Sequence, residues 1–254
     1  MRYAVISDIH ANVHALKAVL DAIRLEGVDR ILCLGDLVGF HTSPGECIDM
    51  LRSHDVTCIA GNHDKGVTGE LGRRLFPREC WEAIEWTREQ LSKDQIDFLR
   101  TLPSHLVVDD LMMLMHGMMG SSHIYLVGRT KLTFAALWLK RAGIPLAFYG
   151  HTHQSSAYRI SGKVFPRYVE SHDTTRPLFF SEHVQHLINP GTVGQPRTTD
   201  TRAIFALLDT TSRRITWMHV AYDYGAVVEE TLKIFPSHER LYRRFQEERI
   251  TEPA

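Results

Sequence analysis

The sequence has few cysteines, no long apolar run and no excess of charge of either sign. Its four cysteines form no CxxC pair, and a chain of 254 residues does not need disulfides to hold its core, so we expect reduced thiols. No segment reaches the roughly 18 apolar residues that span a bilayer, and the apolar run at 3–6 is too short for a signal peptide. These absences predict a soluble, cytoplasmic protein with no membrane partner.

The charges nearly cancel, with 29 Lys and Arg against 30 Asp and Glu. Proteins that neutralise many phosphates of a nucleic acid usually carry an excess of basic residues, so we do not expect a nucleic-acid partner. The hydrophobic fraction of 44% is enough to form a sizeable core, which excludes a disordered chain. We expect one domain over residues 1–254, because no linker or repeat divides them. The oligomeric state stays open.

Short apolar segments alternate with helical patterns in the first part of the chain. Leu16, Val19, Leu20 and Ile23 have the spacing of one helix face, and apolar runs flank them. Such a βαβαβ order predicts a parallel sheet with helical crossovers. Strands are expected at 3–7, 31–35, 56–60, 106–110, 111–115, 146–149, 203–208 and 215–222. Helices are expected around 16–23 and at 44–52 and 132–141, with two more inside 75–101, one of them begun by a capping box at Ser92 and Gln95, and 224–246 is expected to be mainly helical.

Polar side chains follow the ends of several predicted strands. Asp8 and His10 lie two apart, so in an extended chain they face one side and could bind one cation; the alternative is a helix cap beside a solvated histidine. Ligands of open α/β sheets bind at the carboxyl ends of the strands, so these polar residues form one candidate site. The candidate ligands are Asp8, His10, Asp36, Asn62, His116, His151 and His153.

The types of these side chains indicate a metal site. Two carboxylates, four imidazoles and one amide oxygen suit manganese, iron or zinc. Seven ligands are too many for one tetrahedral ion, whereas two ions that share a bridging carboxylate would use them all.

The order of these motifs resembles the signature of the calcineurin-like metallophosphoesterase superfamily. The matching motifs are DxH at 8–10, GDxxG at 35–39, GNHD at 61–64, a histidine at 116 and GHTH at 150–153. The segment 189–197, NPGTVGQPR, is also similar to the NPGSVGQPR stretch of small bacterial and archaeal members. The resemblance implies an α/β fold, a four-layer αββα sandwich of two mixed β-sheets flanked by helices.

The same resemblance implies which residues bind which ion. One ion would be held by Asp8, His10, Asp36 and His153. The other would be held by Asp36, Asn62, His116 and His151, so that Asp36 is the bridge. Two divalent ions are expected, with manganese preferred and iron, zinc or nickel as alternatives.

By this resemblance the protein is a metal-dependent phosphoric ester hydrolase that takes a small phosphodiester or nucleotide. A metal-bridging hydroxide would attack phosphorus, His63 would protonate the leaving oxygen as general acid, and Asp64 would orient His63. A diadenosine-tetraphosphatase-like hydrolase and a phosphoprotein phosphatase stay open as alternatives. A non-catalytic protein-binding scaffold is disfavoured because His63 and all seven ligands are present, and a nuclease is disfavoured by the charge balance.

Substrate contacts are expected from two further residues. Asn12 matches the asparagine of the family's SDIHGN stretch and either approaches a substrate oxygen or caps the following helix. Arg197 ends the glycine-rich segment and could pair with a phosphate. His41 and His123 are candidates for the substrate cleft, and the other eight histidines are expected to be exposed or hydrogen-bonded without a functional role.

Overall fold

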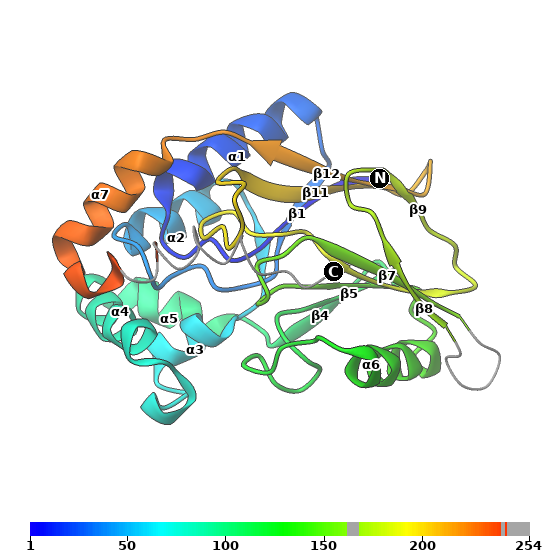
Figure 1. Ribbon diagram of the computed structural model, residues 1–254, viewed down its shortest axis with the longest axis horizontal. Coiled ribbons are helices and arrows are strands. Elements are labelled where there is room, and N and C mark those ends of the chain that lie inside the picture. Colours follow the sequence, from blue (N-terminus) through cyan, green and yellow to red (C-terminus); the bar gives the residue numbers. More distant parts are fainter. Residues whose placement is uncertain (162–167, 240–241, 243–254) are drawn as a thin grey trace.

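Two mixed β-sheets of six strands each form the centre of the computed structural model, which describes residues 1–161, 168–239 and 242 (Figure 1). The first sheet has the order β3-β2-β1-β11-β12-β9, with β3 at Thr57–Cys58, β2 at Arg30–Cys33, β1 at Arg2–Ile6, β11 at Ala203–Asp209, β12 at Arg214–Val220 and β9 at Leu178–Phe179. The second sheet has the order β4-β5-β6-β10-β7-β8, with β4 at His105–Val108, β5 at Met112–Met115, β6 at Leu146–Tyr149, β10 at Gln185–Asn189, β7 at Ser156–Ser161 and β8 at Tyr168–His172.

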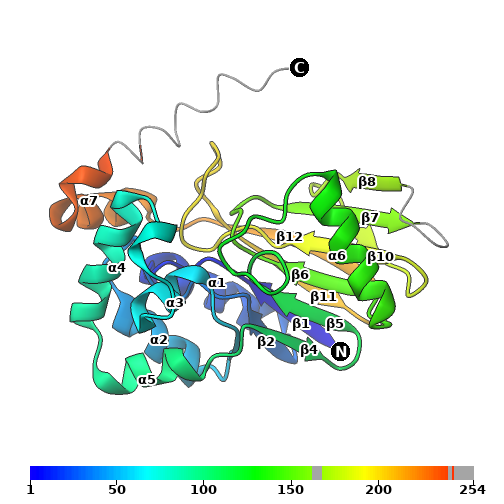
Figure 2. The same ribbon diagram turned by 90° about the horizontal axis from the view of Figure 1, so that it is seen from below.

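Helices cover the outer face of each sheet. Only α6, at Arg129–Arg141, packs on the second sheet among the described helices, and Figure 2 shows it apart from the others. The helices on the other side are α1 at Val13–Glu26, α2 at Pro44–Ser53, α3 at Asn62–Thr68, α4 at Arg78–Gln90, α5 at Lys93–Thr101 and α7 at Tyr224–Ile234, with short 3₁₀ turns at Arg73–Leu75 and Pro236–His238. The layers are therefore helix, sheet, sheet and helix, which confirms the αββα sandwich.

The alternation of side chains along the strands builds three cores from these layers. In β1, Ala4 and Ile6 pack toward the helices, whereas Tyr3 and Val5 pack between the two sheets. In β6, Leu146 and Phe148 face the inter-sheet core and the remaining two side chains face α6. Because successive side chains of a strand point to opposite faces, a strand buried on both sides is apolar throughout; this holds for β6 and for residues 3–6 of β1, which begins at the half-buried Arg2.

The parallel beginning of the chain is confirmed, because β1 pairs in parallel with β2, and β2 with β3. The antiparallel pairing of β1 with β11 makes the sheet mixed. The hairpin of β11 and β12 is confirmed, as are α4 and α5, the latter begun by the capping box of Ser92 and Gln95. Among the described residues, the helices are all too short or too polar to cross a membrane.

The segment 224–246, expected to be mainly helical, is mainly helical where the structure describes it. Helix α7 ends at Ile234, because Pro236 has no backbone N–H with which to continue it, and a 3₁₀ turn at Pro236–His238 follows. Of the segment, 240, 241 and 243–246 lie outside the described residues. The short helix α3, which begins at Asn62, was not predicted, because its polar sequence NHDKGVT has no apolar face by which to recognise it.

Candidate metal centre

The carboxyl ends of four strands and the start of α3 meet at one buried place in the molecule. Asp8 and His10 follow β1, and Asp36 follows β2. His116 follows β5, and the GHTH motif at 150–153 follows β6. Ligand atoms of Asp8, His10 and His153 lie within 4.8 Å of one another, as do those of Asp36, His116 and His151. Asn62 joins the second group, because its Oδ1 lies 3.0 Å from Nε2 of His116.

This convergence depends on unusual backbone conformations. Positive φ angles occur at Asp8 (54°), His10 (51°), Asp36 (52°), His151 (68°) and His153 (61°). These angles lie in the left-handed region, where a residue with a Cβ is destabilised by about 1–2 kcal/mol. The surrounding contacts must therefore impose the conformation. Backbone hydrogen bonds between the loops do so, for example from the N–H of Asp8 to the carbonyl of Gly35 and from that of His10 to Asp36.

Backbone carbonyls orient the imidazole rings of the cluster. Nδ1 of His10 bonds to the carbonyl of Val38 at 3.3 Å, and Nδ1 of His116 to that of Leu34 at 2.8 Å. His153 does the same with the carbonyl of Gln195 at 2.8 Å. A carbonyl can only accept, so each Nδ1 carries a proton; Nε2 therefore keeps its lone pair in the neutral rings of His10 and His153, and His116 would free its Nε2 by giving up its second proton when a metal binds. This is the arrangement of metal-binding histidines.

The ligand atoms converge with few donors among them, which tests whether the site fits cations; Nη2 of Arg197 lies 3.2 Å from Nε2 of His153 and is the donor to that atom. Nε2 of His10 faces Nε2 of His153 at 3.1 Å, and Nε2 of His116 lies 3.2 Å from Oδ2 of Asp36. Oδ2 of Asp36 and Nε2 of His151 are buried and have no hydrogen-bond partner among the described residues. Acceptors that face one another in a buried site repel unless a positive charge lies between them. The residues therefore fit bound cations.

Asp36 lies between the two groups of ligands. Its Oδ2 is 3.2 Å from Nε2 of His116 and 3.6 Å from Nε2 of His10, each of which belongs to a different group. The backbone N–H of His63 donates to its other oxygen, Oδ1, at 2.8 Å. This position is the one that the bridging prediction requires.

The electrostatics of the cluster favour positive charge. Burial lowers the pKa of His151 to about 3 and those of His10 and His153 well below their usual range, so these rings are neutral at pH 7 and can bind a metal. Burial alone would raise the pKa of Asp36, but the charge of His116 overcomes it, and the pKa of Asp36 lies well below its usual range. Burial alone would lower the pKa of His116, but the negative charge of Asp36 outweighs this effect and raises that pKa to about 9.

His63 lies at the edge of the cluster. Its ring is buried, packs 4.8 Å from the rings of His10 and Phe40, and lines the cleft described below. Burial lowers the pKa of His63 to about 4. Gly39 packs against the ring, where a Cβ would overlap Nδ1.

Asp64 has a different contact pattern from the one expected. Its carboxylate accepts the backbone N–H groups of Asp36, Leu37, Val38 and Gly61 at 2.8–3.3 Å. Among the described residues no hydrogen bond joins it to the ring of His63, and its contacts fasten the loop that carries Asp36 to the start of α3. The capping pattern GNHD contained this signal, because an acidic side chain at the third helical position caps the helix start.

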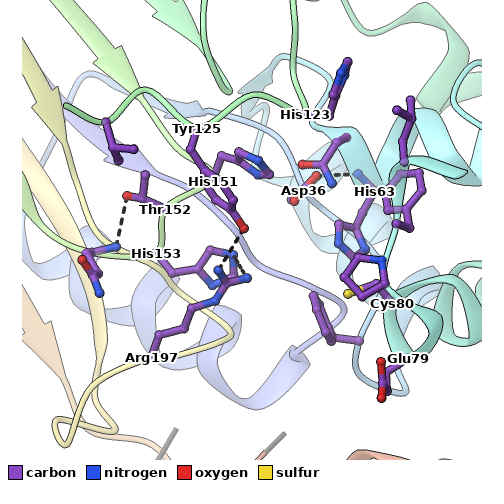
Figure 3. A pocket seen from close by; sticks show the side chains of 17 residues that line it. Asp36, His63, Glu79, Cys80, His123, Tyr125, His151, Thr152, His153 and Arg197 are labelled. Atoms are coloured by element: carbon purple, nitrogen blue, oxygen red, sulfur yellow. Dashed lines mark hydrogen bonds between the residues drawn. The ribbon is translucent and has the colours of Figure 1, made fainter. Parts of the chain in front are cut away.

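A cleft of about 860 Å³ opens over the cluster (Figure 3). His63 and Cys80 lie on one side of it, and Arg197 extends from the other side toward His153. Leu75, Phe76, Pro77, Glu79, Tyr125 and Val127 complete much of the wall. Arg197 and His123 therefore lie where a substrate contact was expected. Tyr125 was missed, because no motif or periodicity distinguishes the segment around it.

Asn12 and His41 are bound within the protein instead. Oδ1 of Asn12 caps α1 by accepting the N–H of Ala15 at 3.0 Å, and its amide donates to the carbonyl of Gly194 at 2.9 Å, which supports the helix-cap alternative. His41 is buried, bonds through Nε2 to the same carbonyl at 3.0 Å and does not line the cleft. The other eight histidines are exposed, half-buried or, in two cases, buried with a backbone carbonyl as partner.

Comparison with known proteins assigns the family. The calcineurin-like phosphoesterase superfamily domain matches residues 1–213. An uncharacterized protein of Methanocaldococcus jannaschii is 31% identical over 237 residues, which are 91% of each chain. The crystal structure of a metallophosphoesterase from Sphaerobacter thermophilus has 30% identity and a TM-score of 0.77 over 97% of this chain and 99% of that one. A hypothetical protein from Pyrococcus horikoshii shares the fold at 20% identity, with a TM-score of 0.73 over 96% and 97%. The chain belongs to the calcineurin-like phosphoesterase superfamily.

Proposed function

We propose that this protein is a dinuclear metal-dependent phosphoesterase that hydrolyses phosphodiesters or nucleotides. The observation that carries the proposal is the convergence of buried ligand atoms, above all the facing Nε2 atoms of His10 and His153 and the Oδ2 of Asp36, which has no hydrogen-bond partner in the part of the chain that the structure describes. One ion would be held by Asp8, His10, Asp36 and His153. The other would be held by Asp36, Asn62, His116 and His151.

When bound, two divalent ions would lower the pKa of water and neutralise the phosphate oxygens, with manganese as the first choice and iron, zinc or nickel as alternatives. His63 would donate the proton that the leaving oxygen needs, because it is the buried imidazole of the cleft that is not needed as a ligand. Its pKa of about 4 would have to rise for this, and the negative charge of a bound phosphate would raise it. Arg197 would bind a phosphate oxygen from the opposite wall. Asn12 and Asp64 would act on the scaffold, since their polar atoms are bound to backbone groups.

The size of the cleft favours a small substrate. A volume of about 860 Å³ lies within the range of small-molecule sites, roughly 300–1,000 Å³. This supports a phosphodiester or nucleotide over a phosphoprotein. A dinucleoside polyphosphate would also be of suitable size, so a diadenosine-tetraphosphatase-like activity stays the second candidate.

A substrate panel on metal-defined protein tests the proposal. The protein is stripped with a chelator and reloaded with manganese, iron, zinc or nickel, and each form is assayed on bis-nitrophenyl phosphate, nitrophenyl phosphate, a dinucleoside polyphosphate and a phosphopeptide. We expect no turnover by the stripped protein and the highest kcat/KM on the diester or a nucleotide. A strong preference for the monoester contradicts the substrate class. A protein that holds two ions and hydrolyses nothing contradicts the enzyme and favours a binding scaffold.

A further inference from the structure

Tyr125 joins the two walls of the metal centre. Its ring stacks on His151, with ring centroids 4.0 Å apart and planes 16° from parallel. Its hydroxyl accepts a hydrogen bond from Nη1 of Arg197 at 3.3 Å (Figure 3). Tyr125 therefore covers His151, a candidate ligand of one ion. It also holds the guanidinium of Arg197, which reaches toward His153, a candidate ligand of the other ion.

The guanidinium of Arg197 uses an atom that a metal would need. Its Nη2 donates to Nε2 of His153 at 3.2 Å and to Oε1 of Gln195 at 3.4 Å. Because Nδ1 of His153 bonds to the carbonyl of Gln195, Nε2 has a single lone pair. An ion bound by His153 would take that lone pair, so the ion and Arg197 compete for it. Their like charges add to the competition.

We propose that Tyr125 and Arg197 form a substrate-positioning pair in which Arg197 changes its acceptor when the ions bind. The N–H that donates to His153 passes to an oxygen of the substrate phosphate, and the hydroxyl of Tyr125 keeps the guanidinium above the centre during this exchange. Tyr125 is thus a positioning residue, because it acts through Arg197. The inference rests on the proposed function, since it assumes that ions and a phosphate share this site.

The pair has a signature that a merely structural role would not produce. Removing the charge of Arg197 should strengthen ion binding, because a competitor for the lone pair of His153 is gone. The same change should weaken phosphate binding, because a charged donor to the phosphate is gone. A residue that only holds the fold together would weaken both when it is replaced.

Binding measurements by calorimetry test this without turnover. Manganese is titrated into the stripped protein, and inorganic phosphate is then titrated into the manganese-loaded protein. R197Q should bind manganese about 2- to 10-fold more tightly, the size of one hydrogen bond, and phosphate at least about 10-fold more weakly. Y125F keeps the ring on His151 but loses the hydroxyl, so its phosphate Kd should rise about 2- to 10-fold while its manganese Kd stays within about twofold.

Y158F is the matched control, because Tyr158 lies in β7 against the core under α6 and should leave both constants unchanged. Melting temperatures check that each variant is folded. Weaker binding of both manganese and phosphate by R197Q would contradict the proposed positioning pair, and so would an unchanged phosphate affinity in Y125F. Wild-type protein that binds both but hydrolyses no phosphoester contradicts the proposed function and leaves the pair intact.

Discussion

The metal cluster and the rim of the cleft differ in how tightly the protein holds their side chains. In the cluster, Asp36 is 1% exposed, and the rings of His10, His116 and His153 are each bound to a backbone carbonyl. On the rim, Leu75 is 46% exposed and Val127 51%. Residues that hold the reacting groups must be fixed to within a fraction of an ångström, whereas residues that contact the rest of a substrate can vary. We therefore expect the cluster to determine the reaction and the rim to determine the substrate.

The substitution D36N should have the largest effect, because it removes charge from the side chain that lies between both groups of ligands. Loss of an outer partner of a ligand costs about 10- to 100-fold in metal affinity, so loss of the bridging ligand should exceed that. We expect fewer than two ions per chain by elemental analysis and hydrolysis at the background rate. D21N, on the exposed face of α1, is the control. Two tightly bound ions in D36N would mean that the cluster tolerates change as the rim does.

The substitution H63A should separate proton transfer from metal binding. We expect both ions to remain and turnover of an ester with a poor leaving group to fall at least about 100-fold, within the 10²–10⁴-fold range of general acid catalysis. Nitrophenyl substrates should lose much less, because nitrophenolate needs little protonation. Equal losses on both kinds of ester would place His63 with the metal ligands instead of the acid.

The substitution G39A should transmit a backbone change to His63. Gly39 has φ 87°, and a Cβ there would overlap the ring of His63, whereas Gly69 has φ 86° and would meet nothing within 4 Å. Both G39A and G69A should lower the free energy of unfolding by about 1–2 kcal/mol through the left-handed backbone. Only G39A should also lower kcat, by about tenfold, as the ring loses its position. Denaturant unfolding and turnover of both variants measure the two effects; equal kcat in both would mean that His63 moves freely.

Much of the cluster could be predicted because its residues follow apolar strands. Asp36 stands directly after a run of strand formers, and the GHTH motif after another, so order and spacing identify them. The αββα layers followed from the resemblance, and the parallel start followed from periodicity. The contacts of Asp64 could not be predicted, because its carboxylate accepts four backbone N–H groups only once the loop at 36–38 folds onto α3.

The rim could not be predicted in the same way. Tyr125 lies in a loop after β5 with no strand or helix period, and its meeting with Arg197 joins residues 72 apart. His41 follows a glycine-rich loop as a cleft residue would, yet the packing of α7 brings Thr231 to within 3.0 Å of it and buries it. Such contacts depend on how separate elements pack, which local sequence does not encode.

The substitution L75S should have the smallest effect and should fall on the substrate alone. Leu75 lines the cleft and is exposed enough for an aromatic leaving group to cover it. Losing that apolar contact should cost about 1 kcal/mol, part of the burial value of a leucine, which is about fivefold in kcat/KM on bis-nitrophenyl phosphate. L25S, at an 85% exposed position of α1, should change nothing. Both variants should keep two ions and the wild-type affinity for inorganic phosphate, because neither side chain is a candidate ligand. If L75S lost an ion, the rim and the cluster would be one unit, and substrate choice could not vary independently of the metal chemistry.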